Sequence, residues 1–394
     1  MIIPEMIAHG DNGAMIDVDA PTPLLGGLSA ARFMRRHWHR APLLVRQAWP
    51  CIEAPADRAD LFALAARDDV ESRLVVRQGD HWALRRGPVP RRSLPPLSRP
   101  GWTLLVQGLD LHVEAAQALL ARFRFVPDAR LDDLMVSYAS DRGGVGPHTD
   151  AYDVFLLQVT GRRRWRIGRC ARPQWRDDVP LKMLKSFDVE HDWVLEPGDM
   201  LYLPPLWAHD GVAVGGDCMT ASIGFRAPAS DELAQVLLAR LADEPVVARP
   251  RRYRDAGQQA TARPGEIPQH MRTFAQEAVQ QALRQPGAVE RALGEWLTEP
   301  KPQVWFDASR GHDQGRRGVR ADRRTRMAYD ATSFFINGES YRYGGRDAEM
   351  LRHLADRRSL DAAQVRLLGA AACLLVTEWL NAGWLHPQGG PDDT

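Results

Sequence analysis

Alternating polar and apolar positions predict β-strands in much of the chain before residue 228. The segment 131–140, LDDLMVSYAS, is apolar and β-branched enough for one such strand. Successive side chains of a strand point to opposite faces, so Asp133, Met135 and Ser137 are expected to share a face. If that face lies inward, two polar side chains enter the interior of the protein.

The segment 146–168, GPHTDAYDVFLLQVTGRRRWRIG, predicts two further strands with a turn at Thr160-Gly161 between them. Alternation places three side chains on one face of the first strand: His148, Asp150 and Tyr152. It places three more on one side of the second strand: Arg163, Trp165 and Ile167. A third segment, 195–209, LEPGDMLYLPPLWAH, predicts a Glu-Pro-Gly-Asp turn, a short strand, a Pro-Pro corner and then His209. The segments resemble the two halves of a cupin barrel.

Helical periodicity replaces the strand pattern from Ser230 to about Leu297. Ser230 suits an N-cap because two acidic residues follow it, and Pro268 suits the first turn of a second helix. Residues 288–297 predict a third helix.

The last region, 302–394, combines a hairpin with helices. Asn337-Gly338 inside FFINGESYRY (334–343) is a strong signal for a two-residue hairpin turn. Helical patterns follow at 347–357 and 361–380. Such a unit has the size of a winged-helix-like module.

Composition narrows the class of protein. Apolar residues make up 44% and charged residues 26% of the 394 positions, which excludes wholesale disorder. The formal net charge of +1 argues against a chain that wraps nucleic acid or senses membranes through basic residues. The four cysteines form no Cys-x-x-Cys pair, so neither a disulfide framework nor a cysteine zinc site is expected.

The sequence pattern also predicts neither a signal peptide nor a membrane span. The first twenty residues lack the basic start and apolar core of a signal peptide. The most apolar stretch, 367–376, is about half the length of a membrane span. We therefore expect a cytoplasmic protein with no membrane partner.

His148-x-Asp150 and His209, which follows Asp150 by 59 positions, have the spacing of a facial triad. Two imidazoles and one carboxylate occupy one face of an octahedral metal and leave three positions for substrate and oxygen. Fe(II) suits this ligand set, and Mn, Co or Ni can bind the same atoms. A single His-x-Asp is a weak signal, but its combination with the downstream turn and the late histidine favours a metal site.

Arg163 is expected on the face opposite to its two arginine neighbours. If that face is the barrel interior, the guanidinium needs an anion, because an unpaired buried charge is very costly. A dicarboxylate co-substrate is a natural partner, with one carboxylate on the arginine and the other end on the metal. Ser137 can add a hydroxyl to the same carboxylate.

Asp133 and Tyr152 allow two interpretations each. Asp133 is either an exposed residue at a strand end or an acid that recognises a cationic side chain such as arginine or lysine. Tyr152 either packs in the core or stacks on that cation.

At these residues the sequence resembles the JmjC-type 2-oxoglutarate oxygenases, specifically the bacterial ribosomal oxygenases that hydroxylate arginine in a large-subunit ribosomal protein. Four blocks carry the resemblance: GVGPHTDAYDVF, TGRRRWRIG, LEPGDMLYLPPLWAHDG and MTASIGFRAP. The segment 33–48 and the C-terminal hairpin with its helices are also similar, so the likeness spans nearly the whole chain. An aspartate, Asp210, follows the last triad residue where a glutamate is common.

The resemblance implies an α+β fold class with three regions. These are a double-stranded β-helix core of the cupin or jelly-roll type with an N-terminal extension (1–228), a helical dimerisation region (229–301) and a winged-helix-like domain (302–394). It implies that iron is bound by His148, Asp150 and His209. It implies that 2-oxoglutarate is bound by Ser137 and Arg163. Three positions match those that line the family's arginine pocket: Asp133, Tyr152 and Ser222.

The resulting hypothesis is a homodimeric Fe(II)- and 2-oxoglutarate-dependent dioxygenase that hydroxylates the β-carbon of an arginine, with no further catalytic residue. Histidine- or lysine-directed hydroxylation or demethylation by a JmjC enzyme is an alternative, since Asp133 cannot separate arginine from lysine. A non-enzymatic metal-cupin or winged-helix regulator that binds nucleic acid is another. The seven arginines of 310–326 favour that regulator, but near-neutral charge opposes it, and nucleic acid is not expected as the direct substrate.

Overall fold

The computed structural model describes residues 17–243, 251–308 and 317–388. Its largest unit is an antiparallel sheet of nine strands. The strands are β1 (Leu43–Val45), β2 (Ser72–Gln78), β3 (His81–Arg86), β4 (Trp102–Val106), β5 (Leu131–Ala139), β6 (Val154–Arg169), β7 (His191–Leu195), β8 (Met200–Leu203) and β9 (Trp207–Phe225). They follow the order β1-β8-β6-β9-β5-β4-β2-β3, and β7 pairs with the second half of β6.

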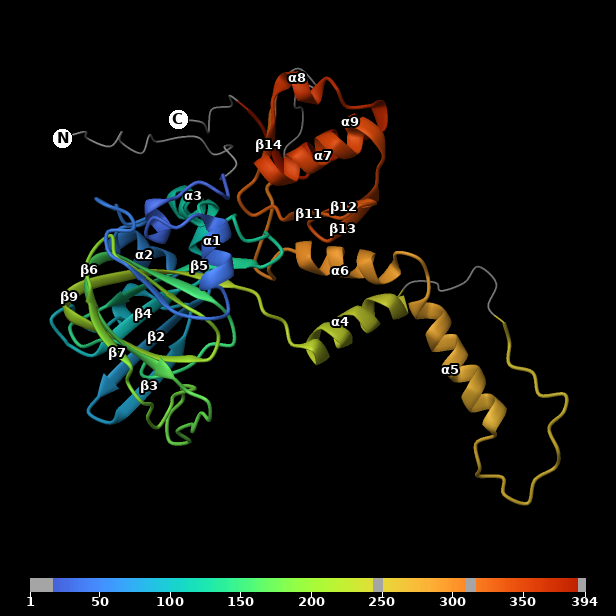
Figure 1. Cartoon of the computed structure of the whole chain (residues 1–394), viewed down its shortest axis with the longest axis horizontal. Helices are drawn as coiled ribbons and strands as arrows, with labels where there is room; N and C mark the ends of the chain where they lie inside the picture. The colour runs from blue at the N-terminus through green and yellow to red at the C-terminus, as the bar shows by residue number, and fades with distance from the viewer. Residues whose placement is uncertain (1–16, 244–250, 309–316, 389–394) are drawn as a thin grey trace.

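The sheet curls around an interior, and its two surfaces bury different side chains (Figure 1). The outer surface is covered by α1 (Ala30–Arg36), α2 (Arg58–Leu64) and α3 (Glu114–Ala121), with short 3-10 turns at Pro23–Leu25, Arg91–Ser93 and Leu109–Leu111. Phe33 of α1 packs there against Phe155 of β6. Leu156 and Trp165 of β6 face the interior instead. The predicted double-stranded β-helix is confirmed.

The predicted turn at Thr160-Gly161 is wrong. β6 is one strand of 16 residues that pairs with β9 on both sides of these residues. The register shifts between Gln158 and Thr160 and again before Arg162, so the strand bulges instead of reversing. Gly161 has φ +66 and lies so close to Asp217 that a Cβ would sit 2.8 Å from its carbonyl oxygen. A bulge supplies the bend because β9 continues beside it as a partner.

Three helices follow the sheet: α4 (Ser230–Asp243), α5 (Gln269–Leu283) and α6 (Ala288–Thr298). They correspond to the three predicted helices, but Ser230 is the first helical residue and not the cap, because Leu233 N–H donates to Ala229 O at 2.9 Å. α4 packs against α6, while α5 projects away from the rest of the molecule (Figure 1). No helix in the described ranges is long and apolar enough to span a membrane.

The C-terminal unit contains two small sheets and three helices. The elements are β10 (Val319–Ala321), β11 (Met327–Tyr329), β12 (Ser333–Ile336), β13 (Glu339–Arg342), α7 (Gly345–Arg357), β14 (Ser359–Leu360), α8 (Ala362–Val365), α9 (Ala370–Asn381) and β15 (Leu385–Pro387). The hairpin turn at Asn337-Gly338 is confirmed, with φ values of 47 and 88. The single helix predicted at 361–380 is wrong, because the chain breaks after α8 and restarts with Gly369 as the cap of α9.

Arginines join this unit to the barrel. Arg323 Nε donates to Leu111 O at 2.9 Å, and Arg326 donates to Asp132 O at 3.3 Å. From the barrel side, Arg124 donates to the backbone oxygen of Ala355 at 2.9 Å. The described part of the Arg-rich segment therefore makes contacts within the chain; residues 310–316 lie outside the described residues.

Candidate metal centre and its pocket

A short backbone bridge places the two histidines side by side. His148 N–H donates to His209 O at 3.0 Å, and His209 N–H donates to His148 O at 2.9 Å. Residues that exchange both backbone hydrogen bonds in an antiparallel pair direct their side chains to the same face. The ring centroids are accordingly 4.2 Å apart. Backbone pairing therefore sets the spacing of the two imidazoles.

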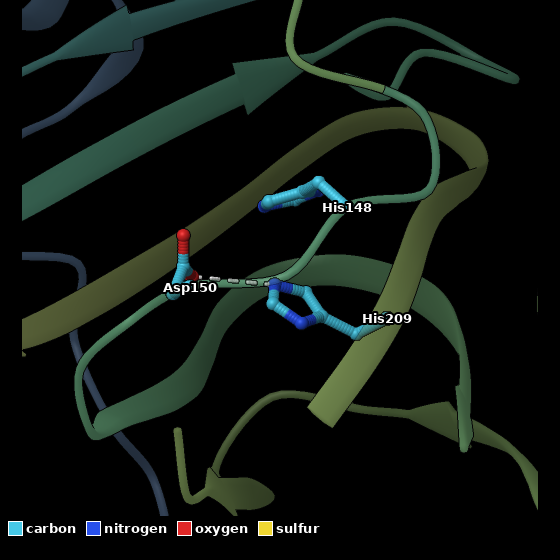
Figure 2. Close-up of side chains that lie close together, drawn as sticks. All are labelled: His148, Asp150 and His209. Atoms are coloured by element: carbon cyan, nitrogen blue, oxygen red, sulfur yellow. Dashed lines mark ion pairs between the residues drawn. The ribbon is translucent and has the colours of Figure 1, made fainter. Parts of the chain in front are cut away.

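Asp150 completes the cluster. Its carbonyl accepts from Leu206 N–H at 2.8 Å, which ties the segment before β6 to the corner before β9. Its Oδ2 lies 3.5 Å from His209 Nε2, and ligand atoms of all three residues lie within 4.8 Å of one another. Figure 2 shows the three side chains directed toward a common point. No other such group of three possible metal ligands occurs among the residues that the structure describes.

Both imidazoles present the same nitrogen to this point. Nδ1 of His148 lies 2.9 Å from Gly146 O, and Nδ1 of His209 lies 2.9 Å from Trp207 O. A carbonyl only accepts, so each Nδ1 carries the proton and each Nε2 keeps a lone pair. Burial, and then the neighbouring His148, lowers the pKa of His209 to about 4. The donor set fits Fe(II), because neutral imidazoles and one carboxylate are what that metal binds.

The predicted strand through His148, Asp150 and Tyr152 is wrong, since β6 begins only at Val154. His148 pairs near the start of β9, whereas Val154 pairs with Gly224 near its end. One straight strand cannot reach both positions. The chain bends between them, and the ligands are held by the bridge and by the Asp150 hydrogen bond.

Arg163 is buried, and its guanidinium makes few and long hydrogen bonds. The residue is 4% exposed, and its Nε has no partner. Its terminal nitrogens make only long contacts, 3.4 Å to Ser137 Oγ and 3.5 Å to Gly211 O. No carboxylate among the described residues pairs with it within 4.0 Å. A buried guanidinium without a counter-ion fits a carboxylate brought by a ligand, and Ser137 lies where its hydroxyl can share that carboxylate.

The alternation predicted around Arg163 holds in β6. Arg162 and Arg164 are exposed, and Arg164 pairs with Asp192. Trp165, the next inward residue, lies between Arg163 and the metal centre: its ring centroid is 5.8 Å from the guanidinium carbon and 5.9 Å from the His209 ring centroid. Gly211 leaves room for this indole, because a Cβ there would lie 2.5 Å from the ring.

Asp133 is buried, so its interpretation as an exposed strand-end residue is wrong. It is 2% exposed and faces the interior side of β5, opposite Gly224. Its carboxylate accepts from Gln107 Nε2 at 2.8 Å, from Gly108 N–H at 3.0 Å and from Lys301 Nζ at 3.0 Å.

Tyr152 and Ser222, the other two residues predicted to line the arginine pocket, differ in burial. Tyr152 is 39% exposed and therefore is not a core residue. Partial burial, followed by the negative charges of Asp150 and Asp133, raises the pKa of Tyr152. Ser222 is buried in β9, directly opposite Met135 of β5.

Sequence reasoning missed three polar residues beside Asp133. These are Gln107, Arg73 and Lys301. Arg73 donates to Gln107 Oε1 at 3.0 Å, so the two residues form a chain of hydrogen bonds that ends at Asp133. Lys301 had one available signal: it is one of only three lysines in a chain whose other basic residues are arginines.

Comparison with known proteins identifies two matching families. Residues 118–233 match the JmjC domain, and residues 278–386 match the ROXA-like winged helix. The ribosomal protein uL16 3-hydroxylase of Escherichia coli (strain K12) is 36% identical over 276 residues, which cover 69% of this chain and 72% of that protein. A probable ribosomal oxygenase of Haemophilus influenzae is 37% identical over 200 residues, or 50% of this chain and 49% of that one.

A solved structure is similar over almost the whole chain. The ribosomal oxygenase YcfD of Escherichia coli, in complex with cobalt and 2-oxoglutarate, superposes with a TM-score of 0.78 at 29% identity. The match covers 92% of this chain and 99% of that one.

Proposed function

Because this chain belongs to the bacterial JmjC ribosomal oxygenases, we propose that it hydroxylates the β-carbon of an arginine in a large-subunit ribosomal protein, using Fe(II), 2-oxoglutarate and dioxygen. The Escherichia coli relative is a uL16 3-hydroxylase, so uL16 is the first substrate to test. The observation that carries the proposal is the cluster of His148, Asp150 and His209 beside a buried, unpaired Arg163.

His148, Asp150 and His209 would hold the iron through two Nε2 atoms and one carboxylate oxygen. Bound iron supplies the activation of dioxygen that an unactivated carbon requires. The rest of the chain binds and orients the reactants. The backbone bridge fixes the imidazoles, and the two Nδ1 hydrogen bonds keep their tautomers.

Arg163 and Ser137 would bind the carboxylate of 2-oxoglutarate that lies far from the metal. The guanidinium is already desolvated, so a carboxylate there gains a charge-assisted hydrogen bond without further burial of the arginine. The stack of Arg163 on Trp165 supports this orientation of the guanidinium.

Asp133, Tyr152 and Ser222 would bind the substrate arginine. An interior carboxylate attracts the guanidinium, and the half-exposed Tyr152 ring offers a face for it to stack on. This placement would direct the β-carbon toward the metal. No residue is required as a general base.

The test incubates the protein with Fe(II), 2-oxoglutarate and uL16 peptides and follows the products by mass spectrometry. We expect a mass gain of one oxygen, about 16 Da, on arginine, with one succinate formed per hydroxylation. Oxygen on histidine, or loss of a methyl group from lysine, would replace the arginine assignment with the corresponding alternative. Salt-sensitive DNA binding without 2-oxoglutarate turnover would favour the regulator instead.

Regional organisation and assembly are part of the proposal. We assign the oxygenase core to 1–228, a dimerising helical region to 229–301 and the winged-helix-like domain to 302–394, in a cytoplasmic enzyme.

Support for dimerisation comes from α5, where Met271, Val279 and Leu283 recur at multiples of four and are 42%, 58% and 42% exposed. Light scattering should give about twice the chain mass of 44.1 kDa, and a monomer at micromolar concentration would exclude it.

A further inference from the structure

Lys301 lies far from Asp133 in the chain and touches it in the fold. It follows α6 by three residues, in the connection that leads to the winged-helix unit. Its Nζ lies 3.0 Å from Asp133 Oδ2 and 3.3 Å from Asp132 Oδ1, and its side chain is 25% exposed. The linker after α6 thus places a cation at the back of the proposed arginine pocket.

A bulge in β5 makes this contact possible. Adjacent residues of a regular strand point to opposite faces, so one ammonium group could not normally reach both Asp132 and Asp133. Leu131 pairs with Phe225 and Asp133 pairs with Gly224, which leaves Asp132 as an extra residue in the strand. The bulge turns both carboxylates toward Lys301.

The two oxygens of Asp133 have different surroundings. Oδ2 accepts three hydrogen bonds, from Gln107, Gly108 and Lys301. Oδ1 accepts one hydrogen bond, from Gln107 Nε2 at 3.1 Å. It lies near Gly224, since a Cβ added to that glycine would be 3.8 Å from the oxygen. The chain itself therefore satisfies Oδ2, whereas Oδ1 can accept a further hydrogen bond from the interior of the barrel.

Charge explains why a lysine is needed here. Asp110, Asp132 and Asp133 lie close together, and burial with the charge of Asp133 raises the pKa of Asp110 to about 7. Burial alone would lower the pKa of Lys301, but these three acids outweigh it and raise that pKa. Lys301 therefore stays protonated and supplies a positive charge beside Asp132 and Asp133.

We propose that Lys301 is a positioning residue for substrate binding: it holds Oδ2 of Asp133 so that Oδ1 faces the substrate arginine. This inference rests on the proposed function. A guanidinium then contacts Asp133 through one oxygen only, because a two-pronged contact would need the oxygen that Lys301 occupies. The remaining selectivity for arginine comes from stacking on Tyr152.

The test compares Lys301→Met, Lys301→Arg and the surface control Lys185→Met. Two measurements are made: the KM for the uL16 arginine peptide, and peptide affinity by fluorescence anisotropy with Mn(II) and 2-oxoglutarate under nitrogen. We expect Lys301→Met to raise the peptide KM and to lower the peptide affinity, each about tenfold or more. Lys301→Arg should recover most of the loss. Turnover of 2-oxoglutarate without peptide, and its KM, should stay within about twofold of wild type for all three variants.

Unchanged peptide affinity in Lys301→Met would overturn the proposal, and so would tighter binding, which would mean that the lysine blocks the pocket. An equal loss of peptide-independent turnover would also overturn it, because the lysine would then support the whole fold. If Lys301→Met does not fold, Lys301→Gln takes its place. Failure of the proposed function is distinguishable, since the wild-type protein would then leave the arginine peptide unmodified.

Discussion

Two buried charges lie inside the same barrel, and the chain treats them in opposite ways. Among the residues that the structure describes, no carboxylate pairs with Arg163 and its Nε has no hydrogen-bond partner, whereas Asp133 accepts from three groups of its own chain. The first arrangement is costly until a ligand arrives, and the second is stable by itself and leaves one oxygen with a single hydrogen bond. The difference fits the two proposed roles, in which Arg163 binds the anionic co-substrate and Asp133 binds a cationic side chain of the substrate.

The largest effect is expected at Arg163. Replacing Arg163 by methionine removes the proposed partner of the co-substrate carboxylate, so we expect turnover to fall by a factor of about 100 or more and the KM for 2-oxoglutarate to rise. Removing an unpaired buried charge should at the same time hold or raise the free energy of unfolding of the ligand-free protein, by up to roughly 3 kcal/mol. Succinate formation and chemical denaturation measure the two effects.

Arg162→Met is the matched control, because that side chain is exposed on the opposite face of β6. It should leave turnover and stability near wild type. A ligand-free Arg163→Met protein that is clearly less stable than wild type would contradict the idea that this arginine waits for an external anion.

Replacing Asp133 should lower the free energy of unfolding, whereas replacing Arg163 should not. Asp133→Asn leaves Lys301 with Asp132 as its nearest acid, so we expect the free energy of unfolding to fall by about 1 to 3 kcal/mol. The KM for the arginine peptide should rise about 30-fold, while 2-oxoglutarate turnover without peptide persists. Peptide kinetics and denaturation in parallel check both statements.

Asp132→Asn provides the comparison for that variant, since its side chain is 41% exposed. Asp132→Asn should change the peptide KM and the free energy of unfolding much less than Asp133→Asn does. Equal losses for the two aspartates would mean that the pair acts only as a structural clamp.

Asp110, which lies close to Asp133, should make the stability of the protein depend on pH. Burial and the charge of Asp133 raise its pKa from 3.8 to about 7, so the folded protein holds this proton more tightly than the unfolded chain. The stability that this proton provides is complete below about pH 4 and is lost as the pH rises through 7. Asp110→Asn should therefore gain stability relative to wild type between pH 4.5 and 8, by roughly 1 to 3 kcal/mol.

Urea denaturation of both proteins at several pH values measures this difference. Asp110 accepts a hydrogen bond from Leu134 N–H at 2.8 Å, and the amide oxygen of an asparagine side chain can accept the same bond, so the change isolates the charge. A stability difference that does not vary with pH would show that Asp110 is not protonated in the folded protein.

Much of the site could be predicted because the signals are local. The inward direction of Arg163 follows from strict alternation along β6, and the hairpin at Asn337-Gly338 follows from the turn preference of two residues. The convergence of His148, Asp150 and His209 was expected from their spacing, although the strand assumed to carry the first two does not exist.

Other features depended on partners far along the chain. Gly161 looks like a turn residue by itself, but the continuing pairing with β9 makes it part of a bulge. The bulge at Asp132 and the partner of Asp133 had no local signal, because Lys301 is 168 positions away.

By itself, the sequence determined the succession of a strand-rich region, three helices and a hairpin unit with helices, the inward and outward faces of the second half of β6, and the residue types available to bind a metal and an anion. These follow from backbone periodicity and side-chain chemistry, which act over a few residues. The tertiary structure decided which charges are satisfied by the chain and which are left for a ligand. That choice depends on distances between residues brought together only when the sheet curls and the winged-helix unit packs against it.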